Sequence, residues 1–139
     1  MDIKYTAEAT SSGEGRTGAV ATSDGVIDEQ VRMPVALGGD GKGTNPDQLF
    51  AAGYAACFHG AMRGVAKSKG VQVPAGATIV AQVGIGPDDT SFGLEVTLIG
   101  NLPGLDQSTA DELMEGAHQV CPYSKATRGN IDVTLKSTV

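Results

Sequence analysis

The chain has 139 residues, a mass of 14.1 kDa and a formal net charge of −6, from 10 lysines and arginines against 16 aspartates and glutamates. This length fits a single domain over residues 1–139, because domains cluster at about 100 to 150 residues. The acidic balance argues against a nucleic-acid-binding protein, which needs a basic face to neutralise phosphates, and against adhesion to anionic membranes.

Targeting signals and membrane spans are not expected. The N-terminus has no basic segment followed by an apolar one, and no apolar run approaches the roughly 20 residues that cross a bilayer. We therefore expect a cytoplasmic protein without membrane insertion. Its two cysteines, Cys57 and Cys121, are too few for a disulfide-stabilised secreted scaffold. In a reducing compartment a bond between them is expected only as part of a reaction cycle.

The first third of the chain predicts a small antiparallel sheet. Apolar and polar residues alternate over 3–9, which is typical of a half-buried strand. The glycine-rich stretch 11–18, around Arg16, predicts a loop. Strands follow at 19–22 and 26–31, joined by a tight turn at 23–25. A second glycine-rich stretch, 37–44, lacks the spacing of a phosphate-binding P-loop, so it is interpreted as a connection.

A long helix is predicted next. Asn45 provides its N-cap, Pro46 suits its first turn, Gln48 fits a capping box, and Gly70 follows its expected last residue, Lys69. From residue 49 to residue 62 the helix is apolar nearly all round and rich in alanine and glycine. Such a helix belongs in the middle of a structure. In a chain of this size, a dimer that pairs the helix with its copy is one way to surround it.

The second half predicts a hairpin, an amphipathic helix and a last strand, which makes the fold class α+β. The hairpin strands are expected at 79–85 and 94–98, with a turn at 86–90. Asp106 or Ser108 can cap the helix, and Pro122 ends it after Cys121, because the residue before proline is pushed out of helical geometry. A helical turn at 124–128 and a strand at 131–135 complete the chain.

The residues alone leave the role of the cysteines open. A cysteine within a buried helix, such as Cys57, is most often a small hydrophobic residue, and burial raises the pKa of its thiol. Cys121 lies at a backbone discontinuity, but sequence spacing cannot place the two sulfurs together. Zinc is not expected, because there is no CxxC pair and the histidines at 59 and 118 show no ligand spacing. Both histidines are interpreted as structural or solvent-facing.

Two longer motifs resemble one known family. Residues 45–58, NPDQLFAAGYAACF, are similar to the central-helix motif of the Ohr branch of the Ohr/OsmC proteins, the bacterial organic hydroperoxide resistance proteins. Residues 121–130, CPYSKATRGN, resemble that branch's second cysteine motif. The resemblance extends to the loop at 15–18 and the C-terminal strand, so it covers essentially the whole chain. It implies an OsmC-like fold in which antiparallel sheets wrap two central helices of an intertwined homodimer.

The resemblance also implies an activity and the residues that carry it. The family reduces organic hydroperoxides, especially lipid-derived ones, to alcohols with a cysteine thiol. By analogy Cys57 is the peroxidatic thiol and Cys121 the resolving one, and their disulfide is reduced by a dihydrolipoyl-type dithiol on a lipoylated protein. No bound cofactor or metal is implied. Arg16 matches the family's active-site arginine, and Asp47 stands where the family has a glutamate, one methylene longer.

Elementary chemistry agrees with these roles. Only a thiolate attacks, and a nearby guanidinium, which keeps its charge, stabilises it. Asp47 can orient Arg16, and its place in the first helical turn suits the helix dipole. The apolar helix around Cys57 favours a hydrophobic pocket, although Phe50, Tyr54, Phe58 and Met62 lie on several faces and fit a core better. Two other functions stay open: a redox sensor or adaptor that uses the same disulfide as a switch, and a non-catalytic ligand-binding domain with structural cysteines.

Overall fold

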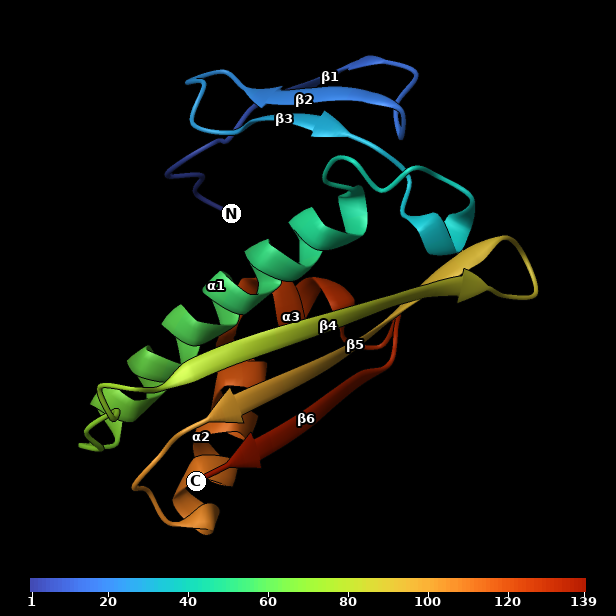
Figure 1. Ribbon diagram of the computed structural model, residues 1–139. Coiled ribbons are helices and arrows are strands. Elements are labelled where there is room, and N and C mark those ends of the chain that lie inside the picture. Colours follow the sequence, from blue (N-terminus) through green and yellow to red (C-terminus); the bar gives the residue numbers. More distant parts are fainter. The chain divides into compact units, whose positions relative to one another are not determined.

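The protein is described here by a computed structural model of residues 1–139, whose contacts form two units, 1–49 and 50–139. The α+β class is confirmed (Figure 1). That the chain acts as one domain stays a prediction. No helix has the length and apolar character that crossing a membrane requires.

The first unit carries a three-stranded antiparallel sheet in the order β1-β2-β3. Its strands are β1 (Ala9–Gly13), β2 (Gly18–Thr22) and β3 (Asp28–Val31), and a 3₁₀ turn, η1 (Val35–Leu37), follows. The predicted sheet, its second and third strands and the turn at 23–25 are confirmed. Gly13 and Gly15 adopt φ of 77° and 68° in the β1–β2 turn, a region that favours glycine. This turn presents Arg16 between two strands paired as far as Gly13 and Gly18.

The strand predicted at 3–9 is wrong. Residues 1–8 form no strand, and β1 runs instead over Ala9–Gly13, into the stretch 11–18 predicted as a loop. Pairing decides the outcome: the β1–β2 turn sets a register in which Ala9 opposes Thr22 and Ser12 opposes Ala19. The alternation of apolar and polar residues over 3–9 therefore predicted a strand in a segment of which only Ala9 joins a strand ladder in this chain.

The second unit packs helices on one face of a second sheet. Helix α1 (Pro46–Ser68) begins at the end of the first unit, and its remaining turns belong to the second. The sheet has the order β4-β5-β6, with β4 (Thr78–Pro87) antiparallel and β6 (Val133–Thr138) parallel to the central β5 (Phe92–Asn101). Helices α2 (Gln107–Val120) and α3 (Pro122–Thr127) lie behind this sheet in Figure 1.

The core joins α1, β5 and α2. It includes Tyr54, Phe58, Met62 and Ala66 from α1, Val96 and Leu98 from β5, and Leu113, Met114 and Ala117 from α2. The α1 residues recur every four positions, so they line one face of the helix. At Gly100 an added Cβ would lie 2.5 Å from the Met114 sulfur, so this glycine lets α2 approach the sheet closely. Within one chain, α1 is thus buried on one face, and Ala52, Ala56 and Gly60 are exposed.

Most predicted helix ends are confirmed. The Asn45 side chain accepts a hydrogen bond from the Gln48 amide at 2.8 Å, and Gly70 follows α1 with φ of 69°. Of the two predicted caps for α2, Asp106 is the one used, accepting from the Thr109 amide at 2.9 Å. Cys121 leaves helical geometry with ψ of 125°, as its place before Pro122 requires.

Candidate functional site

The two thiols lie side by side in the second unit. The sulfur atoms of Cys57 and Cys121 are 3.5 Å apart, and both cysteines are free. A disulfide has an S–S length of about 2.05 Å, so closure requires the sulfurs to approach by only about 1.5 Å. The structure therefore brings together two residues that are 64 positions apart in the chain.

The break between α2 and α3 places Cys121. This residue is both the C-cap of α2 and the N-cap of α3, and its amide donates to the Ala117 carbonyl at 2.8 Å. Its own carbonyl accepts from the Lys125 amide at 2.9 Å. A residue bonded into both helices has little backbone freedom. Cys57, in turn, is fixed by the continuous turns of α1.

The two thiols differ in accessibility. Cys121 is fully buried, whereas Cys57 is partly exposed. An oxidant from solvent therefore meets Cys57 first, and Cys121 is held behind it as a second thiol.

The surroundings of Cys57 favour the protonated form of its thiol. Burial raises the pKa of Cys57, a backbone hydrogen bond from Tyr123 opposes this rise, and the neighbouring Cys121 thiol adds to it. Because only the thiolate is nucleophilic, these neighbours alone do not activate Cys57. Activation of Cys57 calls for a nearby positive charge, and none of the groups that shift its pKa carries one.

Arg16 and Asp47 are brought together in the first unit. Arg16 Nη1 lies 3.4 Å from Asp47 Oδ2, with the arginine side chain 43% exposed and the aspartate 14% exposed. The contact joins a single pair of atoms rather than the two-pronged arrangement that arginine and carboxylates often form. The β1–β2 turn supplies the arginine and the first turn of α1 supplies the carboxylate.

The sequence left four side chains of α1 between pocket and core and placed them on several faces of the helix. Three of them, Tyr54, Phe58 and Met62, lie on one face and are fully buried in the core. Phe50 is partly buried, and its ring stacks on Tyr123 with centroids 6.2 Å apart. What sequence reasoning missed is the Tyr54 hydroxyl, which meets Ser124 and Thr127 at 2.9 and 3.0 Å. No local pattern signals a contact between side chains 70 and 73 positions apart.

The histidines lie apart from any ligand cluster. Burial, followed by the charge of Arg128, lowers the pKa of His118, and its Nδ1 atom is buried without a hydrogen-bond partner. His59 Nε2 is likewise buried without a partner. No group of three or more His, Cys, Asp or Glu side chains is placed to hold a metal ion.

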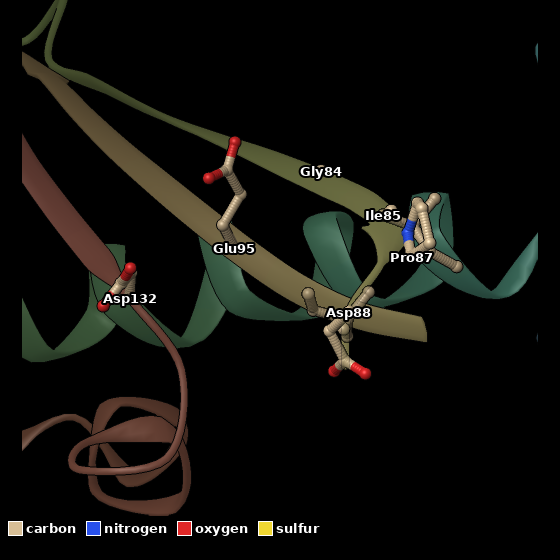
Figure 2. Close-up of a pocket in the computed structure, with 9 residues that line it drawn as sticks. Gly84, Ile85, Pro87, Asp88, Glu95 and Asp132 are labelled. Atoms are coloured by element: carbon tan, nitrogen blue, oxygen red, sulfur yellow. The ribbon is translucent and has the colours of Figure 1, made fainter. Parts of the chain in front are cut away.

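A cavity of about 320 Å³ opens at the β4–β5 turn, away from the cysteines. Three carboxylates line it, from Asp88, Glu95 and Asp132. Figure 2 shows these carboxylates pointing in different directions from the turn, from β5 and from the start of β6. Asp88 already accepts hydrogen bonds from the Thr90 and Ser91 amides at 2.8 and 2.7 Å. The carboxylates therefore do not converge on a common ligand.

Comparison with known proteins identifies the family of this chain. Residues 39–136 match the family described as OsmC-like protein. The chain belongs to this family. It is 52% identical to an organic hydroperoxide resistance protein of Xanthomonas axonopodis pv. citri, over 96% of this chain and 94% of that protein. It is 48% identical to organic hydroperoxide resistance protein OhrB of Bacillus subtilis, over 95% of this chain and 96% of that protein.

Solved structures of OsmC-like proteins share the fold. A crystal structure titled as an organic hydroperoxide resistance protein OsmC, from Legionella pneumophila, superposes with a TM-score of 0.93 at 43% identity, covering 99% of this chain and 100% of that one. The B. subtilis OhrB crystal structure gives a TM-score of 0.89 at 46% identity, covering 98% and 100%. The OsmC-like fold inferred from the two cysteine motifs is confirmed. The family match includes Asp47, Cys57 and Cys121, and Arg16 precedes it.

The difference in burial predicts unequal thiol reactivity. In the native OsmC-like chain, iodoacetamide should label the Cys121→Ser variant, which retains Cys57, roughly tenfold or more faster than the Cys57→Ser variant, since Cys121 reacts only when the structure opens locally. Mass spectrometry of timed samples measures both rates. In urea the two variants should react alike, and equal rates in the native state would contradict the assignment of Cys57 as the accessible thiol.

Proposed function

We propose that this protein is a cysteine-based organic hydroperoxide reductase. Its close relatives are named for organic hydroperoxide resistance, which supports a role in that resistance. The finer proposal depends on one observation, the 3.5 Å separation of an accessible thiol and a buried one. This arrangement suits a cycle in which one sulfur is oxidised and the other closes on it.

The proposed cycle has three steps. The Cys57 thiolate attacks the distal oxygen of the hydroperoxide, the O–O bond breaks, and the alkoxide leaves and takes up a proton to become an alcohol. Cys57 is then a sulfenic acid, which condenses with the Cys121 thiol to form a disulfide and water. A dithiol reduces this disulfide by two exchanges, becoming a cyclic disulfide itself and restoring both thiols.

The electron donor is proposed from the resemblance alone. We propose a dihydrolipoyl-type dithiol, carried on a lipoylated protein in the cytoplasm. A dithiol suits the chemistry, because its second thiol attacks the mixed disulfide within the same molecule.

Turnover tests this function. With dihydrolipoamide as the reductant, the wild-type protein should consume cumene hydroperoxide catalytically. Cys57→Ser should abolish consumption, since it removes the nucleophile. Cys121→Ser should allow one turnover, followed by over-oxidation visible as added oxygen on Cys57.

The same turnover experiment distinguishes the peroxidase from the two other functions, a redox sensor and a binding domain. One oxidation event per chain without turnover would favour a redox sensor, and no reaction of either thiol with hydroperoxide would favour a binding domain. Full activity of Cys57→Ser would refute the nucleophile assignment. Continued cycling of Cys121→Ser without over-oxidation would refute the resolving role.

We propose that Arg16 provides the positive charge that Cys57 requires and that Asp47 orients it. Arg16→Ala should then displace the pH profile of Cys57 oxidation to higher pH, because the raised pKa of the thiol is no longer offset. A displacement of about one pH unit lowers the rate near neutrality about tenfold. Stopped-flow oxidation by cumene hydroperoxide between pH 6 and pH 10, roughly the range over which thiols titrate, measures the profile.

Asp47 provides the matched comparison. Asp47→Asn should move the profile in the same direction as Arg16→Ala, while Asp47→Glu should keep or raise the rate, since it restores the family's longer carboxylate. An unchanged profile for Arg16→Ala would remove Arg16 from the reaction. A large loss in Asp47→Glu would show that the correspondence with the family's glutamate is wrong.

We propose that the chain acts as a homodimer. Along α1, Ala52, Ala56 and Gly60 form an exposed row of small residues four positions apart, which permits close approach of another helix. Light scattering should give twice the mass of 14.1 kDa. Ala56→Glu, which places a charge in this row, should shift the protein toward the monomer. A wild-type mass equal to one chain would contradict the proposal.

A further inference from the structure

The Tyr54 hydroxyl lies at the centre of a buried polar cluster. It is 2.9 Å from Ser124 Oγ and 3.0 Å from Thr127 Oγ1, and Thr127 donates to the Ser124 carbonyl at 3.2 Å. Tyr54 and Ser124 are fully buried, and Thr127 is 6% exposed. Buried hydroxyl groups are costly unless every donor and acceptor finds a partner.

One arrangement of protons satisfies every donor in this cluster. If Thr127 donates to the Ser124 carbonyl, its oxygen can accept the proton of Tyr54. The Tyr54 oxygen can then accept the proton of Ser124. In this arrangement the three hydroxyls form a chain with no unused donor. Removal of the Tyr54 oxygen breaks this chain at two places.

This cluster lies one helical turn from the sulfurs and joins the same segments. Tyr54 precedes Cys57 by three residues on α1, and Ser124 follows Cys121 by three residues at the start of α3. Tyr54 and Cys57 share one face of α1, because residues three apart on a helix are neighbours, and Cys121 is the N-cap of the helix that carries Ser124. The hydroxyl link from Tyr54 to Ser124 and the sulfur pair are thus two parallel connections between α1 and the α2–α3 junction.

We propose that Tyr54 is a positioning residue for the closure of the Cys57–Cys121 disulfide. The inference rests on the proposed function, because it assigns a partner to the resolving step of that cycle. The hydroxyl of Tyr54 holds the first turn of α3 against α1, and thereby keeps the Cys121 sulfur beside Cys57. The condensation itself is unchanged: the Cys121 thiol displaces water from the Cys57 sulfenic acid, and the proton of the thiol leaves with that water.

A positioning role differs measurably from general stabilisation. If the cluster stabilises the dithiol and disulfide forms equally, its loss lowers the melting temperature and leaves the thiol–disulfide equilibrium unchanged. If it holds Cys121 in place, its loss frees the sulfurs in the dithiol form, whereas the bond itself restrains them in the disulfide form. The effective concentration of one thiol at the other then falls, and the equilibrium moves toward the dithiol.

The experiment compares Tyr54→Phe with the wild-type protein. Both are equilibrated in mixtures of reduced and oxidised dithiothreitol, and alkylation followed by mass spectrometry measures the fraction of Cys57–Cys121 disulfide. We expect the equilibrium constant for disulfide formation to fall about threefold to tenfold in the variant, the effect of one or two lost buried hydrogen bonds. Tyr5→Phe, which removes the same atom from a side chain that is 80% exposed, is the matched control and should leave the constant unchanged.

Thr127 provides a second, independent pair of variants. Thr127→Val removes the hydroxyl that accepts from Tyr54 and keeps the branched shape, while Thr127→Ser keeps the hydroxyl. The valine variant should lower the equilibrium constant and the serine variant should restore it. If Tyr54→Phe does not fold, by circular dichroism, the Thr127 pair decides. An unchanged constant in the folded variants would overturn the positioning role.

This equilibrium does not depend on peroxidase turnover, so the two proposals can fail separately. If the wild-type protein turns over cumene hydroperoxide and Tyr54→Phe has the wild-type constant for disulfide formation, only the role of Tyr54 is refuted. If the wild-type protein shows no turnover and Tyr54→Phe still shifts the constant, the peroxidase proposal is refuted and the positioning role is supported.

Discussion

The contact between Cys57 and Cys121 depends on the packing of α1 against α2. Cys121 keeps a helical φ of −64°, and its amide donates to the Ala117 carbonyl at 2.8 Å, so the last turn of α2 sets the position of its sulfur. The core between the two helices, which includes Phe58 and Ala117, holds this sulfur 3.5 Å from the one on α1. Pro122 then turns the chain, with ψ of 125° at Cys121, and α3 begins. The second thiol is therefore placed by the packing of the two long helices, and the break after it directs α3.

The two sulfurs differ in burial, and the environment of Cys57 does not by itself activate its thiol. Cys121 is fully buried, Cys57 is partly exposed, and burial raises the pKa of the Cys57 thiol. A thiol with a raised pKa is less reactive toward oxidants, and it becomes a faster nucleophile when a cation stabilises its thiolate. The proposed role of Arg16, oriented by Asp47, is to supply this cation. Arginine suits it because the guanidinium remains charged at every physiological pH.

Much of this fold could be predicted from the sequence because local chemistry determines it. A capping amide at Asn45, a glycine with positive φ at residue 70 and a proline after Cys121 mark helix ends wherever they occur. The β4–β5 hairpin and the boundary between α2 and α3 follow from the same kind of signal. The strand expected at 3–9 fails because a strand also needs a partner, and pairing is not a local property.

The candidate site also has parts that the sequence could predict and parts that it could not. The sequence singled out Cys57, Cys121 and Asp47 through the resemblance of two motifs and Arg16 through that of the loop at 15–18. The structure brings these residues together as two pairs, each within its own unit. The Tyr54 cluster could not be predicted, because its partners are 70 or more positions away and a tyrosine in an apolar helix is typical of a core. Side-chain hydrogen bonds across such separations become visible only in three dimensions.

Direct detection of the bond between the two sulfurs is the decisive measurement. The reduced protein, dilute enough to suppress exchange between molecules, is treated with one equivalent of cumene hydroperoxide, and its intact mass and peptide map are recorded. The account predicts the loss of two hydrogen atoms per chain and a single cross-linked pair of peptides that contain Cys57 and Cys121. A retained oxygen on Cys57 with Cys121 still free, or a cross-link only between separate chains, would contradict it.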